Sequence, residues 1–280
     1  METKLKKKYR AIAKELNFVF DKPNLQALET INADAQPTTT TSPMMSTAEY
    51  VTLINSSVST VLSTGVLFDG LWSKSFEVQY GEFRRSDGSS LKTPFLVKSK
   101  SYLYYHDEVT MAQVVQINAS PDSTLALMLI LPDENISVEQ YIHNMLTYES
   151  LKQIFKKMRT RANVHLSFPK FRLTASRQMA KPMQTLALKH NLELDRVSKP
   201  GKTTKYVAPV DDNVVLLQKV TINVQERGVD KKKTKSVSLF SREEVNFNAD
   251  RPFIFALVTR GVVQQMVMLG VCDDPSRETW

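Results

Sequence analysis

The stretch that decides the fold runs from Val214 to Val271 and reads VVLLQKVTINVQERGVDKKKTKSVSLFSREEVNFNADRPFIFALVTRGVVQQMVMLGV. Two runs rich in β-branched and aromatic residues, 214–224 and 253–271, enclose a polar segment without periodicity. Such runs favour strands, and the segment between them favours an exposed loop. The first run leads into Glu226-Arg227-Gly228, and the second follows Arg251-Pro252. The pattern therefore predicts two long strands joined by a long loop.

Outside this stretch, the composition is that of a globular protein. The chain has 280 residues, of which 42% are hydrophobic and 24% charged, so it can bury a substantial core. No repeat and no linker interrupts it, which favours one mixed α+β domain over residues 1–280. The formal net charge of +8 favours acidic partners.

Several classes of protein are disfavoured by what the sequence lacks. The lone Cys272 excludes an internal disulfide, no Cys and His cluster has metal-ligand spacing, and no run of 18 apolar residues could span a bilayer. Catalytic and phosphate-binding motifs are also missing, so we expect no enzyme, no metal and no cofactor. Asp273 and Asp274 read as a solvated tail.

Hydrophobic periodicity predicts the remaining elements. Helical spacing favours helices over 3–16, 24–33 and 137–159, the first with a basic outer face. The predicted strands span residues 58–68, 76–80, 92–105, 125–131, 163–173, 214–224 and 253–271. The unbroken apolar run 125–131 is typical of a strand buried on both faces. Pro169 interrupts the run 163–173 and indicates an edge strand or a bulge.

Five segments in a fixed order resemble the serpin family of serine protease inhibitors. They are the strand Thr64–Trp72 with Phe76 four positions on, Leu131-Pro132-Asp133-Glu134, Phe168-Pro169-Lys170-Phe171, the Glu226–Gly228 and Arg251–Phe253 pair, and Met268-Leu269-Gly270-Val271. The resemblance implies a large central mixed β-sheet, two smaller sheets, surface helices and an exposed reactive-centre loop at 229–246. Met1 falls at about the start of the family's fifth helix, so the front of that fold is expected to be missing.

In the family, a protease cuts the loop, which then inserts into the central sheet and traps the enzyme. Counted from the hinge at Glu226 and Gly228, the side chains that should turn into the core belong to Val229, Lys231, Lys233 and Lys235. Inhibitory members place small uncharged residues there. Buried unpaired lysines oppose insertion, so the hinge predicts a non-inhibitory or substrate-like protein. The alternative is a working inhibitor of a trypsin-like protease.

The family's spacing also places the reactive bond and the sheet-opening region. The bond falls between Arg242 and Glu243, with Ser241 as a second choice before the cut. An arginine there would attract trypsin-like enzymes, whose pocket pairs a guanidinium with a carboxylate. At the sheet opening, Thr64 and Gln218 replace the usual asparagine and histidine, and both can still form hydrogen bonds.

Basic surfaces and sequons suggest partners and a location. Lys6, Lys7, Lys8 and Arg10 form a possible site for a sulfated glycan. An extracellular serine protease is the other expected partner; we expect no nucleic acid, no membrane span and a monomer if the fold is complete. Sequons at Asn55, Asn118 and Asn135 fit a secreted glycoprotein, although the N-terminus has no signal peptide. Extracellular is the expectation from the family, and cytoplasmic is the alternative.

Overall fold

The computed structural model describes residues 28–29, 32–33, 60–179, 182–183, 185, 214–230, 244–261 and 264–277. The chain divides into two compact units, described separately below. Residues 1–68, 174–221 and 279–280 form the first unit, and residues 69–173 and 222–278 form the second. No helix among the residues that the structure describes is long and apolar enough to cross a membrane. The expectation of a single domain over 1–280 stays a prediction.

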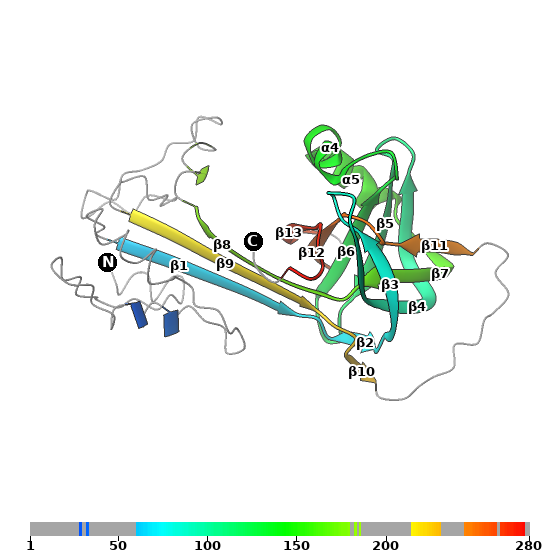
Figure 1. Cartoon of the computed structure of the whole chain (residues 1–280), viewed down its shortest axis with the longest axis horizontal. Coiled ribbons are helices and arrows are strands. Elements are labelled where there is room, and N and C mark those ends of the chain that lie inside the picture. The colour runs from blue at the N-terminus through cyan, green and yellow to red at the C-terminus, as the bar shows by residue number, and fades with distance from the viewer. Residues whose placement is uncertain are drawn as a thin grey trace. The chain divides into compact units, whose positions relative to one another are not determined.

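A three-stranded sheet dominates the described part of the first unit. Its order is β1 (Thr60–Asp69), β9 (Val214–Val224), β8 (Phe171–Gln178), with β9 in the centre. β1 and β9 lie side by side and run in the same direction (Figure 1). The predicted strands 58–68 and 214–224 are thereby confirmed. β9 is central because its valines and leucines are buried along much of its length.

The second unit is built on a larger mixed sheet. Its order is β11 (Val245–Asn248), β7 (Arg159–Pro169), β4 (Ser90–Asp107), β5 (Ala112–Asn118), β6 (Leu125–Pro132), β12 (Phe253–Thr259), β13 (Met266–Cys272), and β3 (Glu77–Arg84) also pairs with β4. A separate parallel pair joins β2 (Trp72–Lys74) to β10 (Gly228–Asp230). The predicted run 253–271 is a hairpin of two strands, β12 and β13.

β4 connects the two halves of this sheet. Its first residues pair with β3 and its last with β5. On its opposite edge, β7 pairs with residues from Phe95 to Tyr104. The register with β7 shifts between Lys100 and Tyr102, which marks a bulge where the strand bends. One 18-residue strand thus serves three neighbours.

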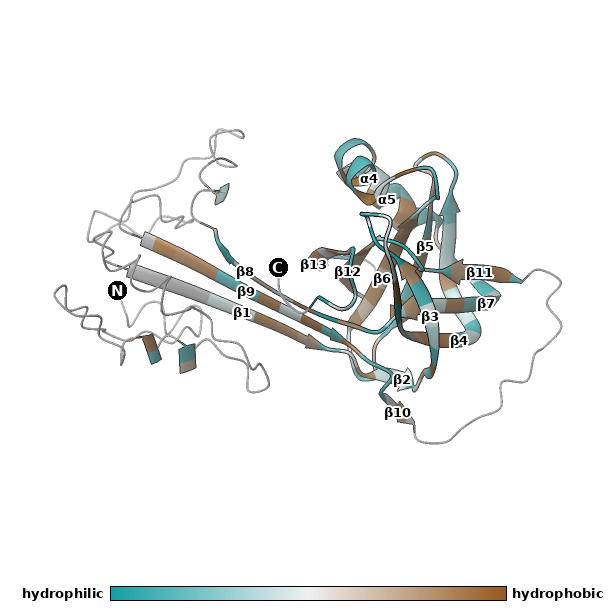
Figure 2. Cartoon of the chain, viewed as in Figure 1, coloured by the Kyte–Doolittle hydropathy of each residue, from teal (hydrophilic) through white to brown (hydrophobic). Residues whose placement is uncertain are grey.

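The run 125–131 behaves as predicted. In β6, every residue from Ala126 to Pro132 is buried, and only Leu125 is partly exposed. Figure 2 shows β6 coloured as strongly apolar along its length. Both of its neighbours, β5 and β12, run antiparallel to it. Its continuous hydrophobicity reflects cover on both faces of the sheet.

Two short helices, rather than one, occupy residues 137–159. They are α4 (Val138–Asn144) and α5 (Tyr148–Lys157). Each begins with a capping box, Ser137 with Gln140 and Thr147 with Ser150, so the second cap ends the first helix and starts the next. The helices cover one face of the sheet, packing against Val114, Met128, Ile130, Ile254, Ala256 and Val258.

The break around Pro169 is confirmed. β7 ends at Pro169 and β8 begins at Phe171. β7 lies between β11 and β4, but its last residues extend beyond β11 and are a local edge. The proline is tolerated because the pairing with β11 stops at Ser167, and no hydrogen bond from residue 169 is needed on that side.

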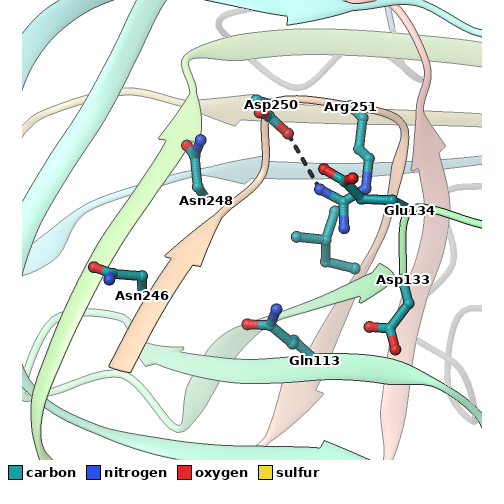
Figure 3. Close-up of a pocket in the computed structure, with 8 residues that line it drawn as sticks. Gln113, Asp133, Glu134, Asn246, Asn248, Asp250 and Arg251 are labelled. Atoms are coloured by element: carbon teal, nitrogen blue, oxygen red, sulfur yellow. Dashed lines mark hydrogen bonds and ion pairs between the residues drawn. The ribbon is translucent and has the colours of Figure 1, made fainter. Parts of the chain in front are cut away.

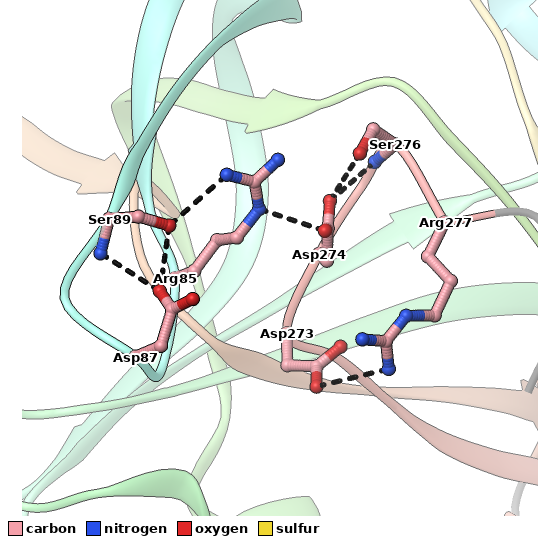
Figure 4. A network of polar contacts seen from close by, with 7 residues as sticks. All are labelled: Arg85, Asp87, Ser89, Asp273, Asp274, Ser276 and Arg277. Carbon is pink, nitrogen blue, oxygen red and sulfur yellow. Dashed lines mark hydrogen bonds and ion pairs between the residues drawn. The ribbon is translucent and has the colours of Figure 1, made fainter.

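The expectation of a solvated tail at Asp273 and Asp274 is also wrong (Figure 4). Cys272 is fully buried, because β13 pairs it with Phe253 of β12. The Arg85 Nε donates to Asp274 Oδ2 at 2.8 Å, and the backbone N–H and hydroxyl of Ser276 donate to Asp274 Oδ1. The hairpin turn before β4 therefore holds the end of β13.

Replacing Asp274 with Asn should lower the free energy of unfolding at pH 7 by about 1 to 2 kcal/mol, because charge-assisted hydrogen bonds are lost. Burial by itself raises the pKa of Asp274. The hydrogen bonds from Ser276 and Arg85 together lower it by more, so the pKa lies below the ordinary value of 3.8. A lowered carboxylate pKa stabilises the fold above pH 4 and loses this effect as pH falls through the folded value.

Urea unfolding at neutral and acidic pH measures the effect of Asp274→Asn. The difference from the parent protein should shrink as the pH falls below about 4. Asp122→Asn is the matched control, because Asp122 is exposed in a turn and its carboxylate forms no hydrogen bond or ion pair with the other described residues. Equal stability of Asp274→Asn and Asp122→Asn at pH 7 would contradict the role assigned to Asp274.

Candidate functional site

The segment that leads into the predicted reactive loop is hydrogen-bonded to the residues that follow β1. The N–H groups of Gly70, Trp72 and Phe76 donate to the carbonyls of Asn223, Arg227 and Glu226 at 2.8, 3.0 and 3.0 Å. β10 then continues this contact by pairing in parallel with β2, in the register Gly228↔Trp72 and Asp230↔Lys74. The hinge therefore begins as an ordered strand.

Trp72 lies at the centre of this contact. Its ring is fully buried, and its Nε1 donates to the Gln225 carbonyl at 2.5 Å. Phe76 meets Trp72 edge to face, with ring centroids 5.6 Å apart, and meets Phe168 of β7 at 5.5 Å. Such pairs add to the burial energy. The aromatic cluster thus packs β2 onto the sheet, and the indole holds the hinge.

Gly228 permits the closest approach in this region. A Cβ at that position would lie 2.0 Å from the Ser75 nitrogen and 2.4 Å from the Lys74 carbonyl carbon. Both are backbone atoms, which cannot move aside as a flexible side chain can. Only glycine fits where two backbones pass this closely, so a glycine at position 228 is a steric requirement.

An ion pair closes the site on its outer side. Lys170 Nζ lies 2.8 Å from Glu226 Oε2, and both side chains are about one-third exposed. The hydrogen bond from Lys170 is the main reason that the pKa of Glu226 lies below its ordinary value. Lys170 occupies the break between β7 and β8, so the pair ties the hinge to that break.

A polar cavity of about 450 Å³ lies beside β11, where the chain leaves the loop (Figure 3). Asn246 and Asn248 of β11 and Gln113 of β5 are among the residues that line it. Its carboxylates already have neighbours, since Glu134 and Asp250 lie near the guanidinium of Arg84 and Asp133 lies near the ring of His106. No group of three metal-ligating side chains occurs in the part of the chain that the structure describes.

The structure places some of the predicted site residues and leaves others outside its described range. Val229 is 51% exposed. The ends of the predicted loop lie in strands, since β10 ends at Asp230 and β11 begins at Val245. The following predicted residues lie outside the described ones: Lys6, Lys7, Lys8, Arg10, Lys231, Lys233, Lys235, Ser241, Arg242 and Glu243.

The predicted sheet-opening residues lie on the adjacent strands β1 and β9. Thr64 donates its hydroxyl hydrogen to the Leu217 carbonyl at 3.5 Å, a long bond, while Gln218 is half-buried. Sequence reasoning did not assign roles to Trp72, Lys170 or Gln225. Trp72 could have been singled out, because it is the last residue of one of the motifs quoted above. Its hydrogen-bond partner Gln225 could not, because it lies 153 positions away in the sequence.

Comparison with known proteins identifies the family. The family model described as Serpin (serine protease inhibitor) matches residues 2–275. The chain belongs to the serpin family. Antitrypsin of Bombyx mori is 23% identical over 221 residues, which cover 75% of this chain and 54% of that protein. The serpin chain thus spans about half the length of the curated relatives it matches.

Solved structures share the fold of this serpin. Native protease nexin-1 with heparin aligns with a TM-score of 0.72 at 21% identity, over 98% of this chain and 72% of that one. Thyroxine-binding globulin in complex with thyroxine aligns with a TM-score of 0.71 at 15% identity, over 99% and 71%. The predicted serpin fold is confirmed, and the family's description is that of an inhibitor rather than a catalyst.

Gly228→Ala should open the β10–β2 pairing, because the added methyl group collides with backbone. Hydrogen exchange in peptides covering 226–230 should accelerate by about tenfold or more. Val229→Ala is the control, since Val229 is largely exposed and its replacement leaves the approach unchanged. Unchanged exchange in Gly228→Ala would contradict the steric requirement.

Glu226→Gln should remove a coupling with Lys170 worth less than about 1 kcal/mol, since both groups are partly exposed and screened by solvent. Because the pKa of Glu226 is lowered, this stabilisation is present at neutral pH and lost as the pH falls through the folded value. A double-mutant cycle with Lys170→Met, read by urea unfolding at pH 7 and pH 3, measures it. A coupling that is unchanged at pH 3 would refute the assignment.

Proposed function

We propose that this serpin presents its loop to trypsin-like proteases as a substrate and does not trap them. The proposal rests on Lys231, Lys233 and Lys235 at the positions that insertion would bury. Each buried, unpaired ammonium costs several kcal/mol even after relaxation. Three in one inserted strand would offset much of the gain from a new central strand. The cut falls after Arg242, with Ser241 as the second choice.

The state of the central sheet supports this proposal. β1 and β9 are direct neighbours, so an inserted strand would have to break their shared hydrogen bonds before forming its own. Thr64 bonds to the neighbouring backbone, which adds a contact that must be released. Insertion would therefore cost free energy both for opening the sheet and for burying the lysines, whereas cleavage without insertion has neither cost.

A working inhibitor with Arg242 as bait is the second candidate. The family's description as serine protease inhibitor favours it, as does a matched relative named antitrypsin. Small residues in the hinge would favour it further, but the lysines stand in their place.

Binding of a sulfated glycan is a separate activity that the charge of the chain favours. The formal net charge is +8, with Lys6, Lys7, Lys8 and Arg10 in one short segment. A related structure, protease nexin-1, was solved with heparin. A polyanion attracts such basic segments through a field that is independent of detailed geometry.

Secretion as a glycoprotein completes the proposal. Asn118 at the end of β5 and Asn135 before α4 are both exposed, as attachment of a glycan requires. An extracellular serine protease and a sulfated glycan are then the expected partners in the same compartment.

Incubation with trypsin should cut the loop without forming a covalent adduct, and the melting temperature should change little on cleavage. Denaturing electrophoresis and a thermal melt measure these outcomes. Replacing Lys231, Lys233 and Lys235 together with alanine should allow insertion, and should raise the melting temperature after cleavage by tens of degrees if the sheet is otherwise competent. An adduct or a rise of that size in the parent chain would give first place to the inhibitor.

A further inference from the structure

A cluster of three lysines lies beside the hinge, on the second unit. Lys98 and Lys100 are alternate residues of β4 and therefore point to one face of the sheet. Lys74 is the last residue of β2. Lys98 Nζ donates to the Ser75 carbonyl at 2.7 Å, next to Lys74 in the chain. The three are called the lysine cluster below.

Aromatic rings support the two lysines of β4. Lys98 Nζ lies 5.6 Å from the centre of the Phe76 ring, and Lys100 Nζ lies 4.8 Å from that of Tyr102. Both rings are themselves buried, and both lysines are half-buried. The rings attract the ammonium groups and hold them in place, so the charges are positioned rather than spread over free side chains.

The charges of Lys98 and Lys100 are poorly compensated. Burial, and then the ammonium groups of Lys100 and Lys74, lower the pKa of Lys98 to about 8. Burial and Lys74 also lower the pKa of Lys100. Glu77 is the acidic neighbour of Lys98, and its effect is the smallest of the four. In the described part of the chain, neither Lys98 nor Lys100 forms an ion pair with a carboxylate.

We propose that the lysine cluster of Lys74, Lys98 and Lys100 binds the sulfate groups of a sulfated glycan. An anion would relieve the repulsion among the ammonium groups and replace the water that the partly buried groups have lost. This inference rests on the proposed binding of a polyanion, and it assigns that binding to residues other than Lys6, Lys7, Lys8 and Arg10.

The surroundings of the cluster favour a glycan over a nucleic acid. Single strands gain affinity by stacking bases on exposed aromatic rings, whereas Trp72, Phe76 and Tyr102 are all buried. A glycan brings anionic groups without bases and needs no exposed ring. The same burial disfavours insertion into a lipid surface at this point.

The bound glycan would lie next to the origin of the loop. Lys74 is the register partner of Asp230, and the sequence continues from Asp230 into Lys231-Lys232-Lys233. A glycan bound to the cluster would lie next to Asp230 and cover the hinge, and would slow cleavage of the loop as well as bind.

Titration with a heparin oligosaccharide of defined length, at about 0.15 M salt, tests the site. The double variant Lys98→Gln, Lys100→Gln should bind about tenfold more weakly or worse, a loss of about 1.4 kcal/mol. Lys92→Gln is a control for the loss of positive charge from β4, because Lys92 is exposed near the start of the strand and outside the lysine cluster. A triple variant of Lys6, Lys7 and Lys8 to alanine separates the two basic surfaces.

The outcomes distinguish this inference from the broader proposal. Loss of affinity in the Lys98, Lys100 variant but not in Lys92→Gln supports the lysine cluster. Loss only in the Lys6, Lys7, Lys8 variant overturns the cluster and leaves glycan binding standing. No binding by the parent chain overturns both. Tighter binding of single-stranded DNA or of anionic lipid vesicles than of heparin, through the same two lysines, overturns the choice of ligand.

A second measurement on the unmodified chain does not depend on how the variants fold. Bound heparin should protect Lys98 and Lys100 from acetylation by a small reagent, as read by mass spectrometry, and should leave Lys92 reactive. It should also slow tryptic cleavage within residues 229–246. Equal labelling of Lys98, Lys100 and Lys92 with and without heparin would overturn the proposal.

Discussion

The close passage of Gly228 over the backbone of Lys74 and Ser75 is the constraint on which the functional region depends. It brings β10 into register with β2, and so fixes the point at which the chain leaves the fold as a loop. The indole of Trp72, bonded to the Gln225 carbonyl, holds the same segment from the buried side. A loop anchored in this way starts from a defined position, which a protease requires of its substrate.

The two ends of the loop are anchored by different means. Before it, β10 has a single strand partner in β2, and after it β11 pairs with β7 at the margin of the larger sheet. The proposed obstacle to loop insertion lies between the two anchors, in the lysines that follow Asp230. Their charge is harmless in solvent and costly in a sheet interior.

Positive charge beside the hinge could also serve to bind an anion. Lys98 and Lys100 are held by aromatic rings, with little compensation from acidic neighbours. In the proposed function, the lysines that would oppose insertion of the loop stay at the surface, where an anion can reach them. The proposed non-insertion and the proposed polyanion binding are therefore compatible, and both depend on the excess of positive charge in the chain.

The sequence by itself determined the elements whose signals are local. β6 and β9 were recognisable as apolar runs, the helical character of 137–159 by its periodicity, and the serpin family by the order of its motifs. β2, β10 and β11 were missed, since strands of three or four residues are too short to show a period, and β5 was missed as well. Only the tertiary structure decided the contacts of Gly228 with Ser75, of Trp72 with Gln225 and of Arg85 with Asp274. Each joins residues more than 150 positions apart, and a pairing over that distance is set by how the sheets pack, which no local pattern encodes.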